Sequence, residues 1–202
     1  MSDIKVDRRV IKTKKVIRNA LTELMADKGF DAITVRDLTE KADINRGTFY
    51  LHYQDKYDLL AQSEEEVLLK LKEIGLNLKN LNLNDIQFFY TQNQPAPFLI
   101  ELFEYLQENS DFMNVILGPK GDPSFQVKIK EVIRQNIIQN LFIKLKKEDM
   151  LVPVEMFIAY VTSAHLGVIQ QWLNSGMKQT PYEISLILFN LTVQGPRASI
   201  GL

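Results

Sequence analysis

The sequence predicts an all-α protein with more than one helical domain. Apolar residues recur every three or four positions along most of the chain, which is the period of one helix face. Helix start and stop signals separate these runs, and no stretch alternates between apolar and polar residues as a strand would. Hydrophobic residues make up 46% of the 202, which is enough to bury a real core.

The first four predicted helices are short or closely spaced. Gly29 ends the first one, and Thr34 with Asp37 fits a capping box that starts the second. After a turn at residues 43–45, Asn45 caps a third helix that continues to about residue 53. Asp55 caps a fourth that stops at Gly75. The apolar face of the first helix consists of Ile17, Ala20, Leu21, Leu24 and Met25.

Residues 76–97 are rich in asparagine and end in two prolines, which predicts a domain boundary. We therefore expect an N-terminal domain at residues 8–56, a connecting helix at 57–75 and a C-terminal domain at 76–202. Helices resume at the prolines that act as start signals. These helices begin near Pro97, at Pro123 (extending to Leu141), at Pro153 (ending near Gly176) and at Pro181 (ending at Gly195). Thr180 and Glu183 predict the cap of the last one.

Charge and cysteine content restrict the possible functions. Residues 1–18 contain seven basic and two acidic residues although the whole chain has a net charge of −1, so the N-terminal end suggests a polyanionic partner. A solvated basic helix is the alternative. The absence of cysteine excludes disulfides and thiolate metal sites. No apolar run approaches the roughly 20 residues of a membrane span, and no signal peptide is visible, so we expect a cytoplasmic protein.

The two short helices that start at Thr34 and Asn45 are joined by a three-residue turn, which is the helix-turn-helix arrangement. In that motif the second helix enters the major groove of DNA. Residues 45–53 are dense in side chains that bind phosphate or base edges, and only Phe49 has to face the core. Glycine at position 47 lowers the helix propensity of this segment. Its presence there is explained either by close approach of the backbone to DNA or by relief of crowding within the motif.

Three segments resemble the DNA-binding region of the TetR family of transcriptional regulators. They are Thr-Val-Arg-Asp-Leu at 34–38, Asn-Arg-Gly-Thr-Phe-Tyr-Leu-His-Tyr at 45–53 and Asp-Lys-Tyr-Asp-Leu-Leu at 55–60. The resemblance implies a homodimer with an N-terminal helix-turn-helix domain and a C-terminal domain that binds an effector and dimerises through its last two long helices. By position, it implies phosphate contacts for Thr34, Tyr50, His52 and Lys56, and base contacts for Arg36, Asn45, Arg46 and Thr48. The candidate DNA-binding set is completed by Val35, Gly47 and Tyr53.

The C-terminal half is similar to a regulatory-domain subgroup common in Gram-positive members of the family. Residues 156–169 are apolar on nearly every side, so we expect one face in the core and another against a second subunit. The expected interface residues are Phe157, Ala164, Val168, Ile184, Ile187, Leu188 and Leu191. The aromatic residues predict an apolar effector pocket, although at helical spacing they also suit a core. The pocket candidates are Phe98, Leu102, Phe103, Phe125, Tyr160 and Trp172.

The sequence carries no motif of a catalytic or cofactor-binding site. There is no glycine-rich phosphate loop, nucleophile elbow or paired His/Glu metal motif, and the two histidines fall in different domains. We therefore expect no enzyme activity, no metal and no cofactor. The predicted function is a regulator, most simply a repressor, that binds a near-palindromic double-stranded operator and is released by a small apolar effector. A regulator switched by a protein coactivator and an unregulated architectural DNA binder are the alternatives.

Overall fold

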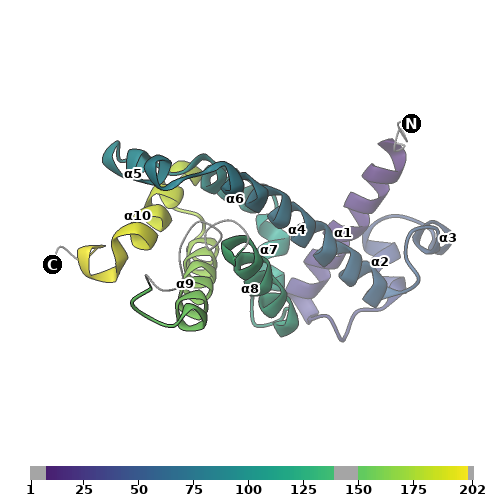
Figure 1. The fold of residues 1–202 in the computed structure, drawn as a ribbon. Helices are drawn as coiled ribbons and strands as arrows, with labels where there is room; N and C mark the ends of the chain where they lie inside the picture. The colour runs from purple at the N-terminus through teal and green to yellow at the C-terminus, as the bar shows by residue number, and fades with distance from the viewer. Residues whose placement is uncertain (1–7, 139–149, 200–202) are drawn as a thin grey trace. The chain divides into compact units, whose positions relative to one another are not determined.

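The computed structural model describes residues 8–138 and 150–199. These residues form ten α-helices and one 3₁₀-helix and contain no β-strand, which confirms the all-α prediction (Figure 1). None of the described helices combines the length and the apolar character that a bilayer crossing requires. The part of the predicted helix that reaches Leu141 lies outside the described residues.

Contacts between backbone segments divide the described chain into two units. Unit 1 comprises the residues up to Val67 together with the segment Val115–Asp122. Unit 2 comprises Leu68–Asn114 and the residues from Pro123 onward. The long helix α4 (Lys56–Leu76) therefore belongs to unit 1 in its first half and to unit 2 in its second half.

Unit 1 is built from three helices and the start of α4 (Figure 1). The three are α1 (Arg8–Lys28), α2 (Val35–Lys41) and α3 (Arg46–Tyr50). Gly29 adopts a φ of 76° directly after α1 and its N–H bonds to the Met25 carbonyl, so the glycine ends the helix as predicted. The core of the unit is almost inaccessible to water and contains Ile17, Leu21, Met25, Leu38, Phe49 and Leu59.

The segment Val115–Asp122 reaches unit 1 from a distant part of the sequence. Lys120 Nζ donates hydrogen bonds to the carbonyl oxygens of Ala26, at 2.7 Å, and Asp27, at 2.8 Å. These carbonyls lie in the last turn of α1, where backbone acceptors lack helical partners. A Cβ on Gly121 would lie 2.0 Å from the Ile116 carbonyl oxygen, so the turn that carries Lys120 needs glycine there. The sequence-based division had assigned this segment to the C-terminal domain.

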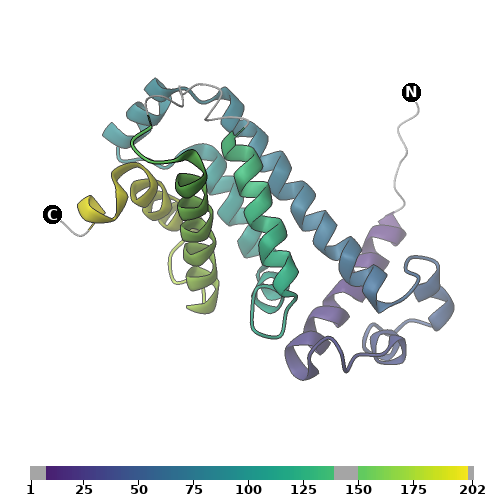
Figure 2. The same ribbon diagram turned by 60° about the horizontal axis from the view of Figure 1, so that its bottom comes forward.

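Unit 2 is a helical bundle. α8 (Pro123–Ile137) and α9 (Val154–Asn174) run side by side, and α10 (Pro181–Ser199) packs on α6 (Pro97–Glu108) and α9 (Figure 2). Thr180 and Glu183 form the predicted cap of α10, with Thr180 N–H donating to Glu183 Oε2 at 2.8 Å. Gly195 has a φ of 75° and interrupts α10 where the sequence predicted its end.

Three features of the helices differ from the sequence-based expectation. The asparagine-rich region contains a 3₁₀-helix, Asn77–Asn80, and a helix α5 (Leu83–Thr91), because Asn82 and Asp85 form a capping box that starts it. A further short helix, α7, spans Ser110–Ile116. The third helix ends at Tyr50 and not near residue 53, with a turn at the next two residues.

Candidate nucleic-acid interface

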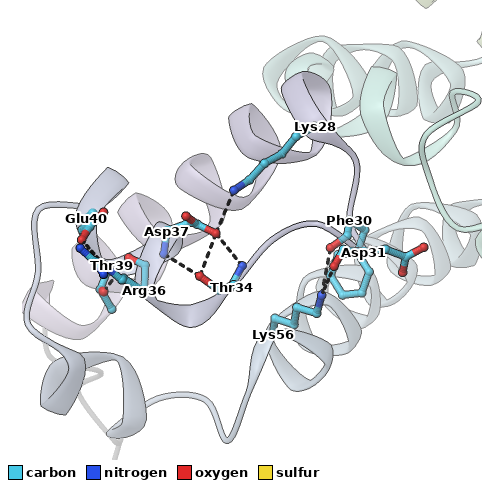
Figure 3. Close-up of polar contacts among 9 residues, drawn as sticks. All are labelled: Lys28, Phe30, Asp31, Thr34, Arg36, Asp37, Thr39, Glu40 and Lys56. Carbon is cyan, nitrogen blue, oxygen red and sulfur yellow. Dashed lines mark hydrogen bonds and ion pairs between the residues drawn. The ribbon is translucent and has the colours of Figure 1, made fainter.

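The first helix of the helix-turn-helix is held by a cap and an ion pair (Figure 3). Asp37 Oδ2 accepts the backbone N–H of Thr34 and the Thr34 hydroxyl, each at 2.8 Å, and Thr34 Oγ1 accepts the Asp37 N–H at 3.2 Å. Lys28 Nζ lies 2.8 Å from the same carboxylate oxygen. These hydrogen bonds, the one from Lys28 first, hold the pKa of Asp37 far below its ordinary value. The beginning of α2 is therefore anchored to the end of α1.

The recognition helix α3 starts at Asn45 as predicted. Asn45 Oδ1 accepts the Thr48 N–H at 2.7 Å and the Thr48 hydroxyl at 3.0 Å. Phe49 is fully buried and fixes which face of the helix points inward. A Cβ on Gly47 would meet only the cap oxygen of Asn45, at 3.3 Å. Packing within the motif therefore requires only a small adjustment to accept alanine at this position.

The described site residues differ in their access to solvent. Arg46 and Tyr50 are exposed on α3, and Arg36 is exposed on α2, where its Nε donates to Glu40 Oε1 at 2.7 Å. That bond raises the pKa of Arg36 above its already high ordinary value. The exposed members of the predicted set are Thr34, Arg36, Asn45, Arg46, Gly47 and Tyr50, and Val35, Thr48, His52 and Lys56 are partly buried.

Tyr53 lies in the core of unit 1, with 4% of its surface exposed. Its ring contacts the ring of Phe49 at a centroid distance of 5.7 Å, and burial raises the pKa of the hydroxyl to about 12. Lys14 Nζ stands 5.7 Å from the centre of the Tyr53 ring. Tyr53 thus supports the packing behind α3, whereas the sequence analysis placed it among the DNA-binding residues.

Lys56 joins the start of α4 to the loop between α1 and α2 (Figure 3). Its Nζ donates to the carbonyl oxygens of Phe30, at 3.1 Å, and Asp31, at 2.9 Å. The ammonium also lies 4.9 Å from the centre of the Phe30 ring and 5.3 Å from that of Tyr57. Two of its three N–H groups are therefore used within the chain, and one is left for another acceptor.

The basic residues in the first half of α1 fall into two groups. Lys14 Nζ donates to Gln62 Oε1 at 3.3 Å, and Arg18 lies 3.9 Å from a carboxylate oxygen of Glu66, so both face α4. The other group is exposed to solvent and comprises Arg8, Arg9, Lys12 and Lys15.

An apolar groove of about 860 Å³ lies between α9 and α10 in unit 2. His165 in this groove bonds Thr192 through Nε2 at 3.0 Å, and the Thr192 hydroxyl donates its own proton to the Leu188 carbonyl at 2.7 Å. His165 Nε2 must therefore be the donor, and burial lowers the pKa of this histidine to about 4. All seven residues expected at a dimer interface line the groove: Phe157, Ala164, Val168, Ile184, Ile187, Leu188 and Leu191.

The six candidates for an effector pocket differ in their burial, and two of them line the groove between α9 and α10. Phe103, Phe125 and Trp172 are fully buried, and the rings of Phe103 and Trp172 meet edge to face with centroids 5.1 Å apart. Tyr160 is 55% exposed and lines the groove between α9 and α10, as does Trp172. The remaining two, Phe98 and Leu102, are partly buried on α6.

Two family models match this chain. One, described as a transcriptional regulator C-terminal region, matches residues 93–194, and the other, described as bacterial regulatory proteins of the tetR family, matches residues 17–62. The chain belongs to the TetR family.

Relatives of this TetR-family chain are themselves transcriptional regulators. The HTH-type transcriptional regulator YxbF of Bacillus subtilis is 40% identical over 180 residues, which cover 88% of this chain and 44% of YxbF. The dhaKLM operon transcriptional activator DhaS of Lactococcus lactis is 31% identical over 110 residues, or 54% of this chain and 51% of DhaS. The chain spans about half the length of the curated relatives it matches. The fold is shared with the fatty acid degradation regulator FadR of Bacillus halodurans (TM-score 0.65, 15% identity, 92% and 96% of the two chains covered).

The tetR family match at residues 17–62 covers the helix-turn-helix that the structure shows at α2 and α3. The structure adds Lys28 and Lys120 to the description of that motif. Lys28 bonds Asp37 at the start of α2, and Lys120 bonds carbonyls at the end of α1. Lys56, for which the sequence predicts a phosphate contact, also bonds the loop between α1 and α2. The sequence signal for Lys28 is its place in the last turn of α1, where a cation is favourable.

Proposed function

We propose that this chain binds double-stranded DNA sequence-specifically as a homodimer that recognises a near-palindromic operator. The observation that carries the proposal is the face of α3: Phe49 is fixed in the core while Arg46 and Tyr50 stand exposed beside the capped helix start. The first turn of a recognition helix is the part that meets base edges in a helix-turn-helix. The exposed basic residues at the start of α1 supply charge for phosphates.

The side chains divide into base readers and phosphate binders. Arg46 is exposed in the first turn of α3 and can pair with two acceptors of a guanine. Tyr50 and His52 follow on the same segment and reach the backbone. Thr34 gives its hydroxyl proton to Asp37, so a phosphate contact at Thr34 competes with that bond. Lys56 reaches a phosphate with its one remaining N–H group.

The groove between α9 and α10 supports the homodimer. Ile187 and Tyr160 leave 41% and 55% of their surfaces exposed there, so a second copy of the chain would cover apolar area that water now contacts. A twofold dimer pairs the same patch on both subunits and presents two recognition helices to successive major grooves.

The switch that controls DNA binding is the finer part of the proposal. A small apolar effector that binds the candidate residues of α6, α8 and α9 would shift the packing of these helices; the candidates are Phe98, Leu102, Phe103, Phe125, Tyr160 and Trp172. Repression that the effector releases is the simplest form.

The alternative, a protein coactivator, has a separate observation in its favour. Leu151, Val152 and Met156 expose 101%, 49% and 65% of their surfaces at the start of α9, outside the groove. DhaS is named an activator, so activation stands beside repression as a mode of control.

Selection of bound duplexes from a random DNA pool tests the proposal. We expect one near-palindromic sequence to be enriched, and Arg46→Ala to relax preference at one position of each half-site, at about 1–3 kcal/mol per lost contact. Lys72→Ala, a change of an exposed lysine on α4, is the control that leaves preference intact. Equal loss of affinity for selected and random duplexes in Arg46→Ala would mean an architectural binder. Screening metabolites for release of the selected duplex then tests the small effector. If the protein retains the duplex in the presence of every compound, the coactivator alternative is favoured.

A further inference from the structure

Among the described residues of unit 1, the most exposed large apolar side chain is Leu51, with 81% of its surface open to solvent. It caps the C-terminal end of α3 in a helical conformation, and its N–H bonds to the Gly47 carbonyl at 3.1 Å. Leu51 therefore stands one helical turn beyond Gly47 on the same side of the recognition helix. A leucine exposed to this degree contributes almost nothing to the core of this unit.

Leu51 and Gly47 share the face that points away from the core. Each lies two positions from the fully buried Phe49, so each points about 160° around the helix axis from it. Gly47 presents no side chain, and a Cβ there would touch only the cap oxygen of Asn45. The centre of the outward face is thus a strip of bare backbone followed by one apolar side chain.

Polar groups flank this strip. Arg46 and Tyr50 are exposed on one side of it, and Thr48 lies on the other. An apolar side chain in such surroundings suits a nucleic-acid surface that is mostly polar but carries an apolar group at a defined place. In the major groove that group is the C5-methyl of thymine, since the other base-edge groups there are hydrogen-bond donors or acceptors.

We infer that Leu51 is a specificity-determining residue that packs against the C5-methyl group of a thymine in each half-site. The inference rests on the proposed function, because it requires α3 to lie in the major groove. The bare backbone at Gly47 allows the helix to approach the base edges, and Leu51 then excludes water from the methyl group. A thymine contact of this kind gives preference for one base without a hydrogen bond.

The test replaces single thymines of the selected operator with deoxyuridine, which lacks only the methyl group. For wild type we expect one thymine of each half-site whose replacement weakens binding by about fourfold, the value of one buried methyl-sized group. For Leu51→Ala we expect weaker binding to the thymine duplex and no response to deoxyuridine at that position. Leu51→Met keeps an apolar contact and should keep the response, and Leu69→Ala, an exposed leucine on α4, should behave as wild type.

Fluorescence anisotropy gives the affinities of wild type and of Leu51→Ala for the thymine duplex and for the deoxyuridine duplex. These four values form a double-mutant cycle between the side chain and the methyl group. If deoxyuridine at each thymine weakens the binding of Leu51→Ala as much as that of wild type, the inference is overturned. The proposal of sequence-specific DNA binding is not affected by that result. Failure of any duplex to be enriched overturns the proposed function, and the inference falls with it. Because Leu51 is exposed, the melting temperature of Leu51→Ala should match wild type, which separates loss of contact from loss of fold.

Discussion

Lys28 Nζ and Asp37 Oδ2 lie 2.8 Å apart and join the last turn of α1 to the first turn of α2. The carboxylate also accepts the N–H and the hydroxyl of Thr34, so one oxygen serves an ion pair and a helix cap together. These bonds lower the pKa of Asp37 in the folded state. One ionised side chain therefore links the start of α2, which carries Arg36, to the end of α1.

Asp37→Asn should lower the melting temperature by a few degrees at neutral pH. Because the folded-state pKa of Asp37 lies below its ordinary value of 3.8, its contribution is fully present above that pH and is lost as pH falls through the folded-state pKa. Thermal unfolding of both proteins across pH should therefore show the difference shrinking below about pH 3.8. Asp31→Asn, which removes an exposed carboxylate from the adjoining loop, is the matched control. A difference that stays constant into strong acid would contradict the role of the ionised form.

Lys56→Met should reduce stability and DNA affinity together. Its two hydrogen bonds to the Phe30 and Asp31 carbonyls are lost, at about 1 kcal/mol for contacts that are partly open to water. The charge is lost as well, so the salt dependence of binding should flatten by about one log–log unit per subunit. Lys12→Met removes a charge that is exposed on α1, and should flatten the salt dependence without changing the melting temperature. Equal melting temperatures for the two variants would show that the Lys56 bonds are unimportant for the fold.

Ile187→Glu should convert the proposed dimer into a monomer. Ile187 lines the apolar groove and is 41% exposed in the single chain, so a carboxylate there would be buried without a partner in the dimer but solvated in the monomer. Light scattering gives the mass, and circular dichroism should show unchanged helix content. Val127→Glu changes an apolar residue of α8 that is 67% exposed and outside the groove, and should stay dimeric. A dimeric Ile187→Glu protein would place the interface elsewhere.

His165 should make the groove sensitive to acid. Its pKa is lowered to about 4 by burial, against an ordinary value of 6.5, so the unfolded chain takes up a proton at a higher pH than the folded one. Stability should fall as pH drops from 6.5 toward 4. Lys178, the charged side chain that lines the same groove, opposes a second positive charge there. The glutamine in His165→Gln can still donate to Thr192. When unfolding is followed across pH, this variant should lack the loss of stability between pH 6.5 and 4 that His165 causes. An identical pH profile in the variant would assign the acid sensitivity to other groups.

Features set by neighbouring residues were predictable from the sequence. The caps at Thr34, Asn45 and Thr180 join positions three apart, and each was expected from its residue types. Asn82 and Asp85 form the same pattern at the start of the helix Leu83–Thr91, but the asparagine-rich composition around them is typical of a linker, so the sequence does not predict this helix.

Features that depend on the folded chain were not predictable. Tyr53 was expected to continue the polar face of the recognition helix, but α3 ends at Tyr50 and the change of chain direction turns Tyr53 into the core. The bonds of Lys56 and Lys120 join residues that are 25 to 94 positions apart. Helical periodicity carries no information about such pairs, since only the packed structure brings them together.

The return of Val115–Asp122 to unit 1 has a consequence for biosynthesis. When α1, α2, α3 and the start of α4 emerge from the ribosome, Lys120 has not yet been synthesised. The carbonyls of Ala26 and Asp27 therefore lack the hydrogen bonds from Lys120 at that stage. N-terminal domains often fold as soon as they emerge. Here the nascent helix-turn-helix acquires its contacts with Lys120 only after the segment Val115–Asp122 has been translated, so its maturation is tied to synthesis of that later segment.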